Sequence, residues 1–215
     1  MTRFLALVLV SVLPLAASAG PGADTPWTRA STEHFIVSGD APAADIAQLA
    51  ARLETLRGVL LDTLPRIDDR SLLPAFIIAF GSDRSFEPWR SAGGTVGAYA
   101  FHEPFMPCMV RRSQRSSAGE DAIRVVVHEY VHVLSDAPWM PLWLIEGIGD
   151  YYSTTTLSRD GRRAELGQRI PYHIEQATRW WVPLPQVLGT SRTSPLADDE
   201  TGRSFFAESW LLVHY

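Results

Sequence analysis

Two histidines and a glutamate lie together in the segment His128-Glu129-Tyr130-Val131-His132, an HExxH motif. An α-helix turns about 100° per residue, so side chains four positions apart project from nearly the same face. His128 and His132 can therefore direct two imidazoles at one metal ion. Glu129, a quarter-turn away, can reach a water on that ion without binding the ion itself. The motif predicts a zinc site with Glu129 as the catalytic base.

Two further carboxylates follow the motif. Glu146 stands eighteen residues after His128, and Asp150 follows Glu146 by four. Zinc prefers four tetrahedral nitrogen, oxygen or sulfur ligands, and a catalytic site leaves one position open. We therefore predict Glu146 as the third ligand after His128 and His132, with one Zn²⁺ per chain. Because Asp150 would share a helical face with Glu146, we predict that it accepts the N–H of a ligating imidazole and fixes its tautomer.

A metal-free alternative uses the same residues. In it the two histidines lie on a buried helix and bond to backbone carbonyls or to Glu146. Burying two histidines beside Glu129, Glu146 and Asp150 without a cation is expensive, because charged groups lose their hydration. The composition of the cluster therefore favours a metal site.

The motif must lie on a helix for these roles. Ser117-Ala118-Gly119-Glu120 matches a capping box, and a terminating turn follows at 135–138. The body at 123–134 is rich in β-branched residues, so a buried strand is the rival, and a strand would send Glu129 to the face opposite the histidines. We predict a helix, followed by a second one from Pro141 to about Tyr152.

The glycines of that second helix and the remaining segments complete the expected pattern. Gly147 and Gly149 each cost a helix up to about 1 kcal/mol relative to alanine, which indicates close approach to a neighbouring element. Apolar periodicity predicts strands at 33–37, 75–80 and 95–101, an edge strand within 104–112, helices at 43–64, 171–181 and 205–215, and a polar loop at 191–203.

The first residues of the chain have the pattern of a cleaved export signal. Arg3, an apolar run over 4–16 and Ala17-Ser18-Ala19 form a secretory signal peptide, with cleavage expected after Ala19. We expect residues 20–215 to form a single periplasmic or secreted domain with no membrane span in the mature chain. The sequence stops inside the apolar helix expected at 205–215, which leaves open whether the chain is truncated at its C-terminus. The formal net charge of −5 makes nucleic acid an improbable partner, and a single cysteine, Cys108, excludes an internal disulfide.

The HExxH together with Trp-Leu-x-Glu-Gly-x-x-x-Tyr at 143–151 resembles the gluzincin zinc peptidases, specifically the peptidase MA-like families of exported bacterial proteins. The segment 206–215 is similar to the helix that follows in those families, and 27–39 to their first strand. The resemblance implies an α+β, zincin-like fold, in which a small mixed β-sheet packs on the HExxH helix beside a C-terminal helical lobe.

The same resemblance implies the hydrolysis of a peptide or protein substrate. Glu129 would take the proton of a zinc-bound water and pass it to the leaving amine. Gluzincins use a Tyr or His beyond the third ligand to stabilise the oxyanion. The candidates are Tyr151, Tyr152, His173 and His214. The alternative is a catalytically silent, protease-like zinc domain that acts as a peptide-binding or envelope-assembly module, although an intact Glu129 argues against it. A third alternative is the zinc-dependent hydrolysis of a substrate other than a peptide.

Overall fold

The computed structural model describes residues 10–14, 26–64, 73–89, 98–101, 108–112, 117–135, 139–194 and 200–215. The chain forms two compact units. The first comprises 1–63 and 69–126, and the second comprises 64–68 and 127–215. The described residues combine helices with small sheets, so the coarse α+β class expected from the sequence is confirmed.

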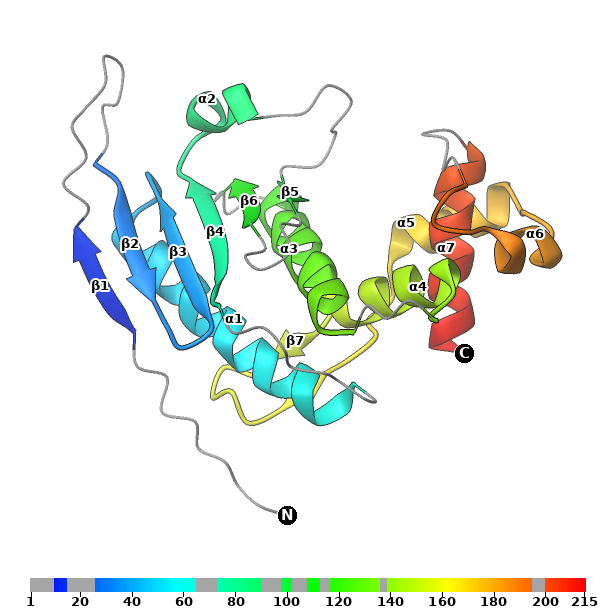
Figure 1. Cartoon of the computed structure of the whole chain (residues 1–215), viewed down its shortest axis with the longest axis horizontal. Coiled ribbons are helices and arrows are strands. Elements are labelled where there is room, and N and C mark those ends of the chain that lie inside the picture. Colours follow the sequence, from blue (N-terminus) through cyan, green and yellow to red (C-terminus); the bar gives the residue numbers. More distant parts are fainter. Residues whose placement is uncertain are drawn as a thin grey trace. The chain divides into compact units, whose positions relative to one another are not determined.

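A six-stranded mixed sheet forms the first unit (Figure 1). Its strands in chain order are β1 (Ser11–Pro14), β2 (Thr28–Ser31), β3 (Phe35–Gly39), β4 (Ala75–Phe80), β5 (Ala98–Phe101) and β6 (Cys108–Arg112). The spatial order is β1-β2-β3-β4-β6-β5. The central pairs β3–β4 and β4–β6 are parallel, and the outer pairs are antiparallel.

Helix α1 (Ala43–Thr63) connects the parallel strands β3 and β4 and packs against β2 and β3. Its buried apolar residues recur every three or four positions, as a helix with one buried face requires; they are Ile46, Leu49, Ala50, Leu53, Leu56 and Leu60. Two short helices, α2 (Asp83–Phe86) and the 3₁₀ turn η1 (Glu87–Trp89), follow β4. The predicted helix at 43–64 and strand at 75–80 are confirmed.

The prediction of an edge strand within 104–112 is wrong. Strand β6 lies inside the sheet, paired on one side with β4 and on the other with β5, so β5 occupies the edge. The short connection between β5 and β6 favours an antiparallel hairpin, whereas the pairing of β6 with β4 joins segments far apart in the chain. Local apolar patterning does not report such distant pairing.

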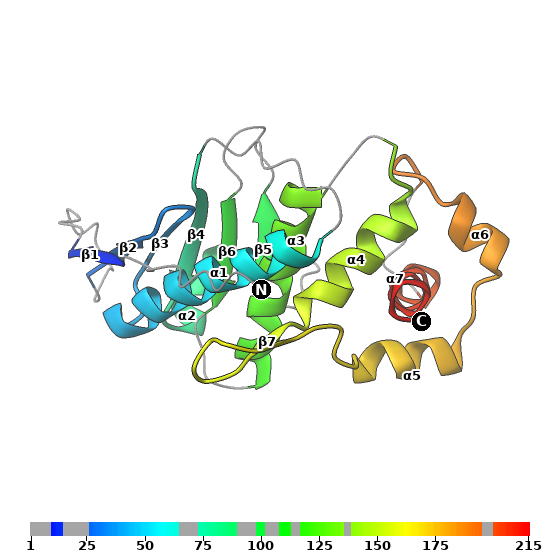
Figure 2. The ribbon, with the colours of Figure 1, turned by 90° about the horizontal axis from the view of Figure 1, so that it is seen from below.

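Helix α3 (Ser117–Ser135) enters the second unit at Val127. Four helices and a small hairpin follow it in the described part of the chain. They are α4 (Leu142–Ser153), the β7–β8 hairpin (Thr156–Leu157 with Ala164–Glu165), α5 (Pro171–Arg179), α6 (Leu184–Gly189) and α7 (Glu200–His214). Helices α4, α5 and α6 surround α7 (Figure 2). Helix α6 was not predicted, and α7 begins inside the segment predicted as a polar loop at 191–203.

Polar side chains fasten α5 and the following segment to α7. The amide of Gln176 donates to Glu200 Oε2 at 2.7 Å and to Ser204 Oγ at 3.1 Å. Glu208, almost fully buried, accepts the backbone N–H of Val182 at 2.6 Å. Buried hydrogen bonds of this kind fix the orientation of α5 against α7, because breaking one leaves a buried polar atom without a partner. Helix α5 is therefore held rigidly, which matters because it carries His173.

Candidate metal centre

The HExxH segment is helical, as predicted, because α3 runs from Ser117 to Ser135. His128 and His132 lie one turn apart, with ring centroids 4.6 Å apart and ring planes at 88°. Glu129, half-buried, lies between them in sequence and a quarter-turn from His128. The strand alternative is excluded for this segment. The side chains of the predicted capping box at 117–120 lie outside the described residues.

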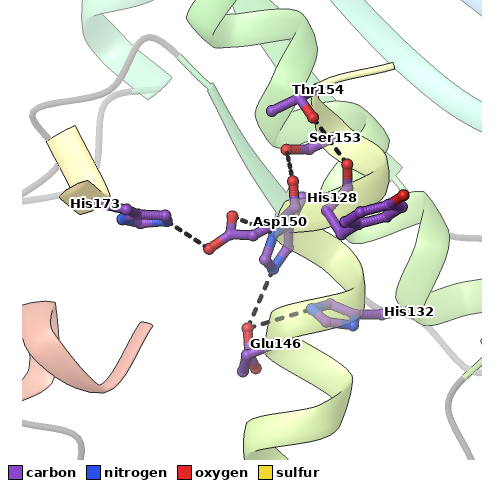
Figure 3. A network of polar contacts seen from close by, with 8 residues as sticks. His128, His132, Glu146, Asp150, Ser153, Thr154 and His173 are labelled. Carbon is purple, nitrogen blue, oxygen red and sulfur yellow. Dashed lines mark hydrogen bonds and ion pairs between the residues drawn. The ribbon is translucent and has the colours of Figure 1, made fainter. Parts of the chain in front are cut away.

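Helix α4 brings Glu146 to both histidines (Figure 3). Glu146 Oε2 lies 3.1 Å from His128 Nε2 and 3.5 Å from His132 Nε2. For zinc with ligand distances of 2.0–2.1 Å, a tetrahedron has edges of about 3.4 Å. The donor atoms of His128, His132 and Glu146 all lie within 4.8 Å of one another, so this group can hold a metal ion.

Asp150 lies one helical turn beyond Glu146 and contacts Nδ1 of His128, the ring whose Nε2 contacts Glu146. Its Oδ1 lies 3.0 Å from His128 Nδ1, which is the contact predicted from the sequence. A neutral imidazole carries one N–H, and an ionised carboxylate accepts it. With the proton on Nδ1, the lone pair of His128 Nε2 faces the space shared with His132 and Glu146. The ring is thus prepared to bind a cation through Nε2.

The acidic and basic groups of the cluster stabilise one another's charged forms. Burial raises the pKa of Glu146, but hydrogen bonds from His128 and His132 outweigh it and lower that pKa to about 2. Burial likewise opposes ionisation of Asp150, yet His128 and His173 hold its pKa well below the usual range. Burial disfavours the His128 imidazolium, but hydrogen bonds to Asp150 and Glu146 raise its pKa well above 6.5. Two ionised carboxylates thus face one imidazole, and a bound cation would replace the proton on its Nε2.

Two glycines of α4 make this approach sterically possible. A Cβ at Gly149 would lie 2.8 Å from His128 Cε1 and 3.0 Å from both ring nitrogens. A Cβ at Gly147 would lie 2.3 Å from the backbone oxygen of Ser209 on α7. The close approach predicted from these glycines is confirmed. Gly149 provides the space that the imidazole occupies, and Gly147 allows α4 to pack directly against α7.

The four residues considered as oxyanion donors lie in different places. His173 on α5 lies 2.7 Å from Asp150 Oδ2 through its Nε2. The Tyr151 ring lies beside Gly167, and its centroid is 5.9 Å from that of His214, which packs against Trp210 at 4.8 Å. Tyr152 is buried.

Among these four, His173 joins the cluster through Asp150. Its link to Asp150 was not foreseen, since a spacing of 23 residues in sequence carries no periodic signal.

Comparisons with known proteins do not assign the chain to a family. No model of a known protein family matches it, and no curated protein matches it either. Within the described parts of the chain, no helix is long and apolar enough to cross a bilayer. The function is therefore inferred from the residues of the site.

Proposed function

We propose that the chain is an exported zinc-dependent metallopeptidase of the gluzincin type, with His128, His132 and Glu146 as metal ligands and Glu129 as the base. The observation that carries the proposal is the position of Glu146 Oε2, at 3.1 and 3.5 Å from the two Nε2 atoms. These separations fit the edges of a tetrahedral zinc site. Two imidazoles and one carboxylate are also a ligand set that suits zinc and leaves a position for substrate or water.

The protonation that the cluster requires favours a bound cation. Without one, His128 must carry two protons to satisfy both Asp150 and Glu146. With one, a neutral ring suffices, since Nδ1–H donates to Asp150 while Nε2 binds the ion. A divalent cation also balances the two ionised carboxylates. We therefore favour the metal-bound state over a metal-free cluster of hydrogen bonds.

The chemistry follows from the residue types. Bound zinc would polarise a scissile carbonyl and lower the pKa of an attacking water. Glu129, adjacent in sequence to the ligand His128, would serve as the base that takes up a proton from the attacking water and delivers it to the leaving amine. His128, held by Asp150, keeps its tautomer through the cycle. The proposed zincin-like architecture, with the sheet packed on α3, is part of the same proposal.

The decisive experiment combines metal content with peptide cleavage. Wild type and Glu129→Gln are purified without chelators, assayed for zinc by elemental analysis, and incubated with a mixed peptide library. We expect about one zinc per chain in both and cleavage by wild type alone, because a side-chain amide at this position cannot take up a proton. Glu175→Gln, which removes an exposed charge paired with Arg179, is the matched control and should retain both properties.

The other outcomes separate the alternatives. Zinc in both proteins without cleavage would favour a peptide-binding zinc domain. Loss of zinc in Glu129→Gln would show that Glu129 acts as a ligand. Absence of zinc from every preparation would refute the metal site and the hydrolytic function with it.

Export is the remaining part of the proposal. Removal of residues 1–19 would remove β1 and leave β2 at the edge of the sheet. N-terminal sequencing of protein recovered from the periplasm or medium should begin at Gly20. A protein that retains Met1 in the cytoplasm would contradict this assignment.

A further inference from the structure

The Asp150 carboxylate lies between two imidazoles. Its Oδ1 lies 3.0 Å from His128 Nδ1, and its Oδ2 lies 2.7 Å from His173 Nε2. Figure 3 shows His173 directed at Asp150 from α5, while His128 comes from α3. The two oxygens of one carboxylate thus join two histidines that belong to separate helices.

His173 is held in place by its own surroundings. Its side chain is buried, and its ring centroid lies 5.9 Å from that of the fully buried Trp210. Pro171 begins α5 two residues earlier, and Gln176, one turn later, is bonded to α7. A ring packed in this way has little rotational freedom, so its Nε2–H presents a fixed donor to the carboxylate.

A fixed donor on Oδ2 has a consequence for Oδ1. A carboxylate with a single partner can rotate about its last bond, since that torsion is broad. With both oxygens engaged, the plane of the Asp150 carboxylate is set, and so is the direction from which His128 Nδ1–H is bound. Partners behind the ligands of a metal site set ligand orientation and metal affinity in this way.

We propose that His173 is a positioning residue of the metal centre, which fixes the Asp150 carboxylate and through it the tautomer and orientation of His128. The proposal rests on the proposed metal site. It assigns His173 a role other than oxyanion donor, because its Nε2 is directed at Asp150. His173 Nδ1 is buried and has no hydrogen-bond partner among the described residues, so the bond to Asp150 is the polar contact that accounts for the position of the ring.

The test measures zinc affinity rather than activity. Full-length wild type and variants are stripped of metal, and their zinc dissociation constants are determined by competition with a chromogenic chelator. We expect His173→Leu, which removes the donor and leaves an apolar side chain, to weaken zinc binding by about 10- to 100-fold. His173→Gln can place an amide N–H near the position of Nε2 and should stay within a few-fold of wild type.

Gln176→Leu is the matched control. It removes a buried polar side chain from the same helix and breaks bonds to α7, but it leaves Asp150 and His173 intact. Because Gln176 helps to hold α5, this variant should lower the melting temperature; since the contact between His173 and Asp150 remains, it should weaken zinc binding by much less than His173→Leu does. If Gln176→Leu and His173→Leu weaken zinc binding equally, His173 merely supports the fold and the proposal is overturned.

A double-mutant cycle with Asp150→Asn tests the route of the effect. If His173 acts through Asp150, then adding His173→Leu to Asp150→Asn should weaken zinc binding by much less than it does in wild type. Full additivity would overturn the proposal. Should His173→Leu not fold, His173→Asn replaces it, since its shorter amide does not reach the position of Nε2; equal affinities of the Gln and Asn variants would also overturn the proposal.

The outcomes separate this inference from the proposed function. Wild type that binds no zinc overturns both. Wild type that binds zinc but cleaves no peptide removes the peptidase assignment, while the affinity series still decides the role of His173. Tight zinc binding by His173→Leu overturns the positioning role alone.

Discussion

Gly149→Ala tests the placement of His128 directly. The added Cβ would lie 2.8 Å from His128 Cε1, whereas two carbons in contact prefer about 3.5 Å or more. The ring must therefore move by about 0.7 Å. Its nitrogens now lie 3.0 Å from Asp150 and 3.1 Å from Glu146, so a shift of this size stretches one contact beyond the roughly 3.5 Å limit of a hydrogen bond.

The magnitude follows from the loss of that contact. Disturbing the residue behind a metal ligand typically costs 10- to 100-fold in metal affinity, which corresponds to about 1.4–2.7 kcal/mol. Alanine in place of a helical glycine stabilises the folded protein by up to about 1 kcal/mol, which offsets part of the folding stability lost with the stretched contact. We therefore expect Gly149→Ala to bind zinc about 10- to 100-fold more weakly, while the melting temperature of the metal-free protein changes little.

Chelator competition and thermal melting in excess chelator measure the two quantities separately. Gly58→Ala is the control, because Gly58 is exposed within α1 and a Cβ there meets no atom within 4 Å. It should raise stability by up to about 1 kcal/mol and leave zinc affinity unchanged. Wild-type zinc affinity in a folded Gly149→Ala protein would refute the placement of the His128 ring against α4.

Three further predictions concern packing and pH. Gly147→Ala should destabilise the protein by about 1–3 kcal/mol in urea denaturation, because its Cβ would lie 2.3 Å from a backbone oxygen of α7; an unchanged midpoint would contradict that packing. The pKa of His128 is raised by Asp150 and Glu146 against burial, so zinc must displace a proton near neutral pH. Calorimetry in buffers of different ionisation enthalpy should detect about one proton released per zinc, and the zinc-dependent rise in melting temperature should grow as pH increases; a pH-independent rise would contradict this. Burial opposes ionisation of Glu54, but hydrogen bonds with Thr32 and His34 lower its pKa below 4.5. The stability that this group contributes is present above pH 4.5 and is lost as pH falls through the lowered value, so the advantage of wild type over Glu54→Gln in urea should shrink on acidification; a constant difference would argue against it.

The parts of the site that the sequence predicts are those set by helical geometry. His128 and His132 lie four residues apart, as do Glu146 and Asp150, so each pair shares a face as soon as its segment is helical. The glycines between the carboxylates indicated a close neighbour, and the structure gives each a different one. In these cases the spacing of residues along a helix was sufficient to predict the contact.

The parts that the sequence does not predict depend on contacts between distant segments. His173 reaches Asp150 only after α5 has packed beside α7, and no spacing encodes that approach. The segment 191–203 was interpreted as a loop because it is polar, yet α7 begins inside it at Glu200 and continues through Gly202 and Ser204. Both are buried in the structure, and small residues of this kind suit close packing of a helix against its neighbour. The interior position of β6 likewise results from pairing with β4, far away in the chain.

The composition of α4 matches the contacts that this helix makes. Glu146 and Asp150 face His128, Gly149 gives the imidazole room between them, and Gly147 brings the helix close to α7. Two glycines weaken a helix by up to about 2 kcal/mol relative to alanine. The buried, charge-assisted bonds of the cluster offset this, since each contributes roughly 1.5–3 kcal/mol. A larger residue at either position would strengthen the isolated helix, but at Gly149 it would displace His128 from the carboxylates and at Gly147 it would force α4 away from α7. The order Glu-Gly-x-Gly-Asp therefore favours the site and its packing over the stability of the helix that carries it.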